Sequence, residues 1–265
     1  MANYDYYNRE ERAICAHLFR LLHEKLKEKI NSPLGQFLAL LSKSNIKFMN
    51  GSSSFKNFNY ENVAIYCEAA ILRDAFENAK PNANDYMDSI TKIVMKQHAI
   101  YADCKLFSQL DEQLNGKKRN GKYNTHPKQI KQKAEKLGIH LTPNENLVYQ
   151  TIQEMFNAKP DLVITIDNLL LVCEAKHTQK FDTVQIARTE NIAELWATLL
   201  YKDFGFIKPP VYAVFTLGAN EDKFKPNITW ADVLQITEKT YEYNDRTLLA
   251  IKAGADLLNR NKKLI

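Results

Sequence analysis

The chain has 265 residues, of which 45 % are apolar and 25 % are charged, and 36 Lys and Arg residues against 31 Asp and Glu residues give a net charge of +5. These proportions exclude a disordered chain, and 8 Gly and 8 Pro residues are too few for collagen-like or low-complexity sequence. No apolar run approaches the ~20 residues that cross a membrane, and residues 1–7 lack the features of a signal peptide. We therefore expect a soluble, cytoplasmic protein without a membrane partner.

Apolar residues recur at helical spacing through most of the first 114 residues. The pattern predicts a first helix that ends before Pro33, and then helical segments at about 33–43, 63–81 and 85–114. We therefore expect residues 1–114 to form a helical N-terminal region. Nothing in this region carries a chemical signature.

The next segment holds the whole basic excess of the chain. Eight of its residues are basic and one, Glu135, is acidic, so 117–136 carries +7 and the rest of the chain −2. The basic residues are Lys117, Lys118, Arg119, Lys122, Lys128, Lys131, Lys133 and Lys136. We expect 115–141 to form a basic loop and short helix that link the two halves of the chain. Such localised charge favours a polyanion partner, and a solvated lysine-rich loop is the alternative.

From residue 142 onward the pattern changes to alternating helices and strands. Thr142 and Glu145 form a capping box before a helix that ends near Asn157. The predicted strands are 162–166, 169–174 and 211–217. Further helices follow the second and third strands, so 142–265 predicts an α/β core in which helices flank a mixed central sheet.

The first two of these strands are joined by Asp167-Asn168, which predicts a two-residue hairpin turn. In that register the numbers of paired residues add up to 335, so Asp161 lies opposite Glu174 and both side chains point to one face. Lys176, two residues beyond Glu174, points to the same face. The turn therefore predicts that two acids and one lysine converge at one end of the hairpin.

Apolar residues lie on both faces of this hairpin, so the two carboxylates are expected at the rim of a buried sheet. Neighbouring carboxylates repel each other there, and one lysine can neutralise only one of them. A divalent cation removes this conflict, because it takes carboxylate oxygens as ligands. The alternative is a cross-strand ion pair at the edge of the sheet.

The order of these residues resembles the PD-(D/E)XK nuclease superfamily, which has the restriction-endonuclease-like fold. That order is a proline followed by Asp161, two apolar strands around a turn, and then Glu174-Ala175-Lys176. The resemblance covers about 142–217, roughly a third of the chain. It implies that Asp161, Glu174 and the carbonyl of Ala175 bind Mg²⁺, for which Mn²⁺ can substitute, and that Lys176 orients or activates the attacking water. It also implies a Mg²⁺-dependent endonuclease that hydrolyses DNA phosphodiester bonds, for example in restriction or anti-phage defence.

The same resemblance implies further site residues on the flanking helices. The superfamily often places an additional acid on the preceding helix, where Glu145 is the candidate with Glu154 behind it, although the capping box explains Glu145 equally well. On the following helix, Gln185 and Arg188 stand where some branches contact the nucleic acid, and a solvent-facing helix is the alternative. His177 is expected to point to the opposite face of its strand.

Two other functions stay open at this point: a catalytically inactive nucleic-acid-binding or assembly protein on the same fold, and a nuclease that acts on RNA. The complete set of two acids and one lysine favours the enzyme. The N-terminal helices are expected to bind a partner, to form a homodimer or to recognise a nucleotide sequence.

Overall fold

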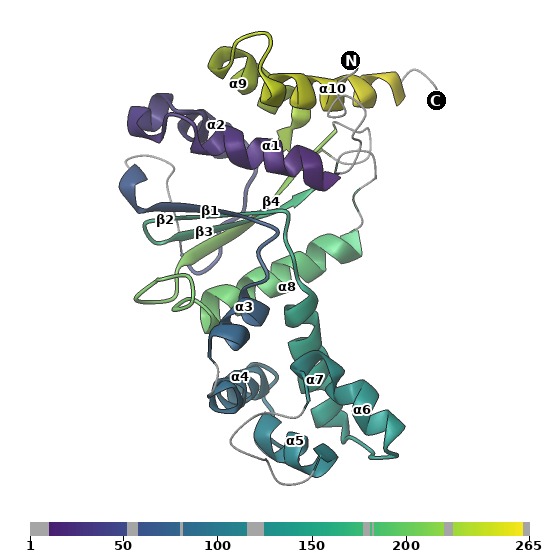
Figure 1. Cartoon of the computed structure of the whole chain (residues 1–265). Helices are drawn as coiled ribbons and strands as arrows, with labels where there is room; N and C mark the ends of the chain where they lie inside the picture. Colours follow the sequence, from purple (N-terminus) through teal and green to yellow (C-terminus); the bar gives the residue numbers. More distant parts are fainter. Residues whose placement is uncertain are drawn as a thin grey trace. The chain divides into compact units, whose positions relative to one another are not determined.

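The computed structural model describes residues 11–51, 58–79, 82–115, 125–176, 181, 183–219 and 225–261. Contacts within the chain divide it into two compact units (Figure 1). Unit 1 consists of Met1–Ala69 and Pro160–Ile265, and unit 2 of Ala70–Lys159. Unit 2 is therefore an insertion in the sequence of unit 1.

Unit 1 contains a mixed sheet, which has five strands in the described part of the chain, in the order β1-β2-β3-β4-β5. The pairs β1–β2 and β2–β3 are antiparallel, whereas β3–β4 and β4–β5 are parallel. The strands are β1 (Val63–Cys67), β2 (Leu162–Ile166), β3 (Leu169–Ala175), β4 (Val211–Gly218) and β5 (Ile228–Thr229). The predicted α/β fold with a mixed central sheet is thus confirmed.

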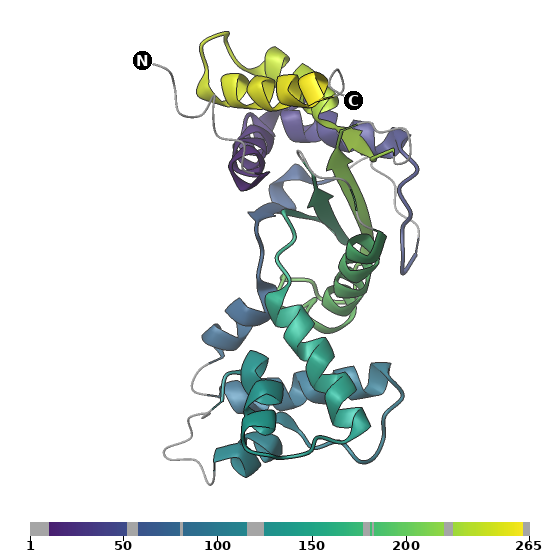
Figure 2. The same ribbon diagram turned by 90° about the vertical axis from the view of Figure 1, so that its right-hand side faces the viewer.

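Helices cover both faces of this sheet (Figures 1 and 2). On one face lie α1, α2 and α9, with α10 packed against α1 and α9, and on the other face lies α8. Their bounds are α1 (Glu11–His23), α2 (Pro33–Lys43), α8 (Thr183–Leu199), α9 (Trp230–Thr240) and α10 (Arg246–Asn261), and the short 3-10 helices are η2 (Leu26–Asn31) and η3 (Tyr60–Asn62). The predicted N-terminal helices therefore exist as α1 and α2, and they pack on the sheet.

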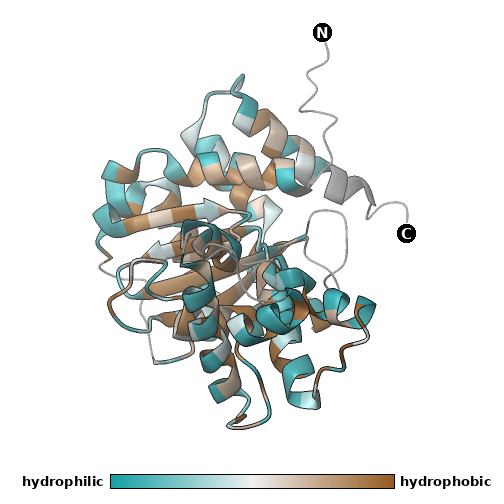
Figure 3. Cartoon of the chain, turned by 60° about the horizontal axis from the view of Figure 1, so that its bottom comes forward, coloured by the Kyte–Doolittle hydropathy of each residue, from teal (hydrophilic) through white to brown (hydrophobic). Residues whose placement is uncertain are grey.

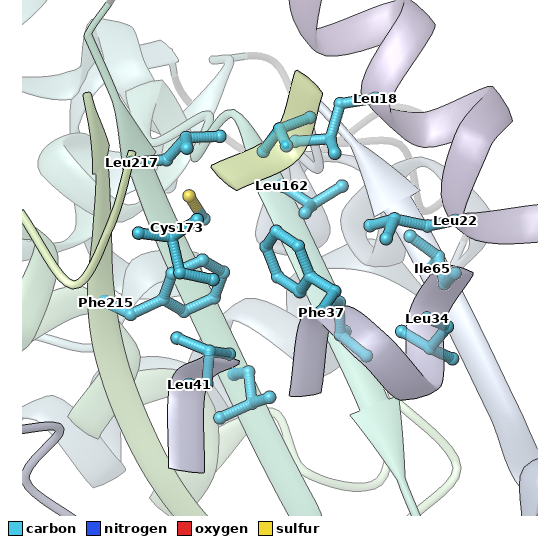
Figure 4. Packing of buried hydrophobic residues seen from close by; sticks show 14 of the residues in the cluster. Leu18, Leu22, Leu34, Phe37, Leu41, Ile65, Leu162, Cys173, Phe215 and Leu217 are labelled. Atoms are coloured by element: carbon cyan, nitrogen blue, oxygen red, sulfur yellow. The ribbon is translucent and has the colours of Figure 1, made fainter. Parts of the chain in front are cut away.

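The main core of unit 1 lies between the sheet and α1, α2 and α9 (Figure 4). Leu18 and Leu22, four residues apart, share one face of α1 and are fully buried. The rings of Phe37 from α2 and Phe215 from β4 meet edge to face, with their centroids 5.9 Å apart. Each fully buried side chain of this kind stabilises the fold by roughly 1.5–3 kcal/mol. Figure 3 shows hydrophobic colours along the strands and alternating colours along the helices, as expected when each helix buries one face.

Unit 2 is helical in its described residues and has a core of its own. Its elements are α3 (Ile71–Asn78), α4 (Ala83–Gln97), α5 (Phe107–Asn115), η4 (Pro127–Gln129), α6 (Ile130–Lys136) and α7 (Pro143–Asn157). The rings of Phe76 and Phe156 pack with centroids 5.5 Å apart, and His126 lies 5.2 Å from Phe156. The predicted capping box of Thr142 and Glu145 is present at the start of α7.

The division of the chain differs from the predicted boundaries at 114 and 141. Helical spacing predicts one helix over 63–81, whereas this stretch contains strand β1 and helix α3. The predicted linker 115–141 contains η4 and α6, which belong to unit 2, and so does α7, the helix before the hairpin. The reason is that β1 pairs with β2, which follows the whole insertion, and local periodicity carries no information about so distant a partner.

Candidate active site

The hairpin of β2 and β3 has the predicted register, because the numbers of every residue pair add up to 335. Asp161 and Glu174 are the next residues of this register, at the end away from the turn. In the turn Asp167 has a φ of 50°, a left-handed conformation that Asp adopts more readily than most residues. Its Oδ2 accepts a hydrogen bond from the N–H of Asn59 at 2.9 Å, which anchors the turn.

Alternation along the strands puts the candidate residues on the face that α8 covers. Leu162 and Cys173 point to the opposite face, where both are fully buried in the main core. Asp161 and Glu174, their neighbours in sequence, therefore point toward α8. The hydrogen bonds between Glu174 and two residues of α8 agree with this orientation.

Glu174 and Lys176 form a buried ion pair. The Nζ of Lys176 lies 3.0 Å from Oε1 of Glu174, and each side chain is only 8 % exposed. Both residues leave the same face of the chain at the end of β3, as the two-residue spacing predicts. The ammonium of Lys176 therefore neutralises one of the two carboxylates without any further group.

Two residues of α8 complete the surroundings of the Glu174 carboxylate. The amide Nε2 of Gln185 donates to Oε1, and the hydroxyl of Thr189 lies 3.3 Å from Oε2. Gln185 is thus brought to the site, in contact with an acid, whereas Arg188 on the same helix is exposed. Nothing in the sequence pattern points to Thr189, because only the packing of α8 on β3 brings this residue to the site.

Asp161 lies at the start of β2 and is half-buried. Its Oδ2 accepts a hydrogen bond from the N–H of Ala175 at 2.8 Å. Since the N–H of Lys176 donates to Leu217 on β4, the backbone groups of the preceding Ala175 point the other way, toward the Asp161 side. Burial raises the pKa of the nearby Cys67 thiol, and the negative charges of Glu68 and then Asp161 raise it further.

The donor groups at this end of the hairpin fit a hard divalent cation. Asp161 and Glu174 offer carboxylate oxygens and Ala175 a carbonyl oxygen, which is the chemistry that Mg²⁺ prefers. Two carboxylates and one ammonium leave a single negative charge for a cation to balance. In the described residues, no group of three or more His, Cys, Asp and Glu side chains is arranged to hold a metal ion. A cation here would therefore depend on two carboxylates, one carbonyl and water.

The backbone of Lys176 is held on both sides. Its N–H donates to the carbonyl of Leu217 at 2.8 Å, and its carbonyl accepts from the indole Nε1 of Trp230 at 3.0 Å. Trp230 is the first residue of α9 and is 1 % exposed. Nothing in the sequence pattern points to this contact, because the two residues are 54 positions apart and no local pattern connects them.

Glu145 has a full set of partners inside unit 2. It is 1 % exposed, its Oε2 accepts from the N–H of Thr142 at 2.9 Å, and its Oε1 accepts from the Nζ of Lys105 at 3.2 Å. Glu154 is exposed and accepts from the amide of Gln150 at 3.2 Å. These contacts explain Glu145 through helix capping and one ion pair, and its catalytic role stays a prediction.

The basic segment is described only in part. Lys117, Lys118, Arg119, Lys122 and also His177 lie outside the described residues. Near the start of α6, Lys128 is exposed, while the Nζ of Lys131 donates to Gln150 of α7 at 3.2 Å. The role of these residues in binding nucleic acid therefore also stays a prediction.

Comparison of the chain with protein-family models, with curated proteins and with solved structures gives no match. The resemblance to the PD-(D/E)XK superfamily therefore depends on the chain's own residues and their geometry. No helix in the described parts of the two units has the length and apolar character needed to cross a membrane.

Proposed function

We propose that this protein is a divalent-cation-dependent nuclease that hydrolyses DNA phosphodiester bonds. The observation that carries the proposal is the arrangement of Asp161, Glu174 and Lys176 at one end of a buried hairpin, with Lys176 3.0 Å from Glu174. Burial matters here, because charged groups at a site of low dielectric act more strongly on a reacting group than they do in water.

Each residue has a separate part in the proposed reaction. Asp161, Glu174 and the carbonyl of Ala175 would hold Mg²⁺ or Mn²⁺, which supplies Lewis-acid stabilisation of the negative charge on the phosphate. Lys176 orients the attacking water and stabilises the charge that develops in the transition state. Gln185 and Thr189 hold both oxygens of Glu174 in place from α8.

The basic segment supports a nucleic acid as the substrate. Residues 117–136 carry +7, which suits phosphate contacts that do not depend on sequence. DNA and RNA backbones share this chemistry, so RNA is the second substrate to be tested. We further propose that the protein works in the cytoplasm, and a homodimer is a proposal for its assembly.

A second function has one observation in its favour. The Glu174 carboxylate already has an ammonium, an amide and a hydroxyl as partners, so it is satisfied without a cation. This is what a catalytically inactive nucleic-acid-binding protein needs if the cluster only stabilises the fold. The two functions differ in one measurable respect, which is hydrolysis.

The test is incubation of the purified full-length protein with supercoiled plasmid, linear duplex DNA and single-stranded RNA, each with Mg²⁺, Mn²⁺ or excess chelator. We expect cleavage of DNA that needs the cation and is lost in Glu174→Gln. The matched control is Glu238→Gln, the same substitution at an exposed position of α9, which should cleave like the wild type. Cleavage of RNA alone would change the substrate, and binding without any hydrolysis would favour the inactive protein.

A further inference from the structure

Lys176 lies just beyond the last residue of β3, where regular strand pairing has ended. Its side chain reaches Glu174, and the direction of the backbone at this residue sets the point from which that side chain starts. The carbonyl of Lys176 is fixed by a side chain from a different part of unit 1, the indole N–H of Trp230 at 3.0 Å.

Trp230 itself is held firmly. Thr229 and Asp232 form a capping box at the start of α9, in which Oδ2 of Asp232 accepts from the N–H of Thr229 at 2.8 Å and from its hydroxyl at 2.6 Å. Thr229 also belongs to β5, which pairs with Gly218 of β4. The indole is therefore positioned both by the sheet and by the first turn of a helix.

Gly218 on β4 lies close to the Lys176 carbonyl and to the ring of Phe181. A Cβ atom placed on Gly218 would lie 2.5 Å from Cε2 of Phe181 and 3.4 Å from the carbonyl oxygen of Lys176. The ring of Phe181 thus packs directly on Gly218, and a larger residue at this position would require the ring to move.

We propose that Trp230 is a positioning residue for Lys176: its indole N–H fixes the Lys176 carbonyl and so keeps the ammonium on Oε1 of Glu174. This inference rests on the proposed function for its catalytic consequence, because a misplaced ammonium would serve the attacking water less well. The structural part can be measured without any activity. The chain also contains a matched control, since it has two tryptophans and both are buried.

The experiment compares Trp230→Phe with Trp196→Phe. Trp196 is fully buried, and its Nε1 has no hydrogen-bond partner among the described residues, so this control loses an indole without losing a hydrogen bond seen in that part of the chain. Acetylation of Lys176 by acetic anhydride at low conversion is followed by mass spectrometry of the full-length protein. We expect the rate of Lys176 acetylation to rise by about fivefold in Trp230→Phe, which is the factor that corresponds to the net free energy of one hydrogen bond. The rate should stay unchanged in Trp196→Phe.

Cleavage kinetics give a second readout. The kcat of Trp230→Phe should fall by about the same factor with KM unchanged, since Trp230 acts on Lys176 and not on substrate binding. If Trp230→Phe does not fold by circular dichroism, Thr229→Val replaces it. This substitution removes the cap that positions the indole, and the expected increase in Lys176 acetylation is smaller.

Equal Lys176 acetylation in wild type and in the folded variant would overturn the inference. So would an equal increase in Trp196→Phe, because the effect would then come from loss of packing. If the wild type cleaves no nucleic acid under any condition, the proposed function fails, and the acetylation rates alone still decide whether Trp230 positions Lys176.

Discussion

Replacing Lys176 by Met is expected to destabilise unit 1, because Glu174 keeps its charge in a buried position. At 3.0 Å and an effective dielectric constant of about 20, the Coulomb attraction is about 5.5 kcal/mol. Desolvation offsets part of it, and loss of one partner of a buried pair costs about 3–5 kcal/mol. Gln185 and Thr189 still donate to the carboxylate, so we expect about 3 kcal/mol for Lys176→Met.

The double variant separates the pair from its surroundings. Glu174→Gln alone should also cost about 3 kcal/mol, whereas Lys176→Met with Glu174→Gln removes both charges and should cost clearly less than the sum. The assay is urea unfolding followed by tryptophan fluorescence, which reports on unit 1 because both tryptophans lie there. As controls, Glu238→Gln and Lys239→Met at exposed positions of α9 should change stability by less than about 0.5 kcal/mol. Additive effects of the two site substitutions would refute the buried, coupled pair.

Three further predictions concern unit 2. The combined change Lys117→Ala, Lys118→Ala and Arg119→Ala should weaken binding to all DNA sequences alike. The slope of the logarithm of the binding constant against the logarithm of the salt concentration should become shallower by up to about 0.9 per lost phosphate contact. Burial, together with the charge of Glu145, raises the pKa of Cys104 to about 11, so its alkylation at pH 8 should be roughly 10²-fold slower than that of a free thiol and should rise with pH up to about pH 11. Glu145→Gln should lower the stability of unit 2 by about 1 kcal/mol in calorimetry, since a capping side chain is kept and an ion pair is lost, and should speed the alkylation of Cys104.

Each of these predictions has a distinct contrary result. Lys25, Lys27 and Lys29 form an exposed basic cluster of unit 1. Replacing these three residues by Ala should leave the salt dependence of DNA binding unchanged. An equal change there would show that the effect is one of net charge alone. Fast alkylation of Cys104 at pH 8 would contradict the raised pKa of this half-buried thiol. If Glu145→Gln stays folded but loses most of its cleavage activity, the result would favour Glu145 as the additional catalytic acid.

The hairpin could be predicted from the sequence because its information is local. Asp167-Asn168 fixes the length of the turn, the turn fixes the register, and the period of two along a strand fixes the face on which Asp161, Glu174 and Lys176 lie. The helix start at Thr142 is local in the same sense, and the capping box is present as predicted.

The remaining features depend on contacts between distant parts of the chain. Val63–Cys67 carries a helical and a strand pattern at once, and only its pairing with β2 decides for the strand. That pairing also joins the N-terminal helices to the sheet and makes Ala70–Lys159 an insertion. Thr189 and Trp230 reach the site through the packing of α8 and α9, for which the sequence has no spacing rule.

The most direct test of the central claim is single-turnover cleavage of a labelled DNA duplex over a series of Mg²⁺ concentrations, with the wild type and Asp161→Asn. We predict that the wild-type rate rises with Mg²⁺ and saturates. Asp161→Asn keeps the size of the side chain and loses one ligand charge, so it should bind the duplex equally well and show no cleavage at any Mg²⁺ concentration. Wild-type rates in Asp161→Asn, or a wild-type protein that cleaves nothing in Mg²⁺ or Mn²⁺, would contradict the account.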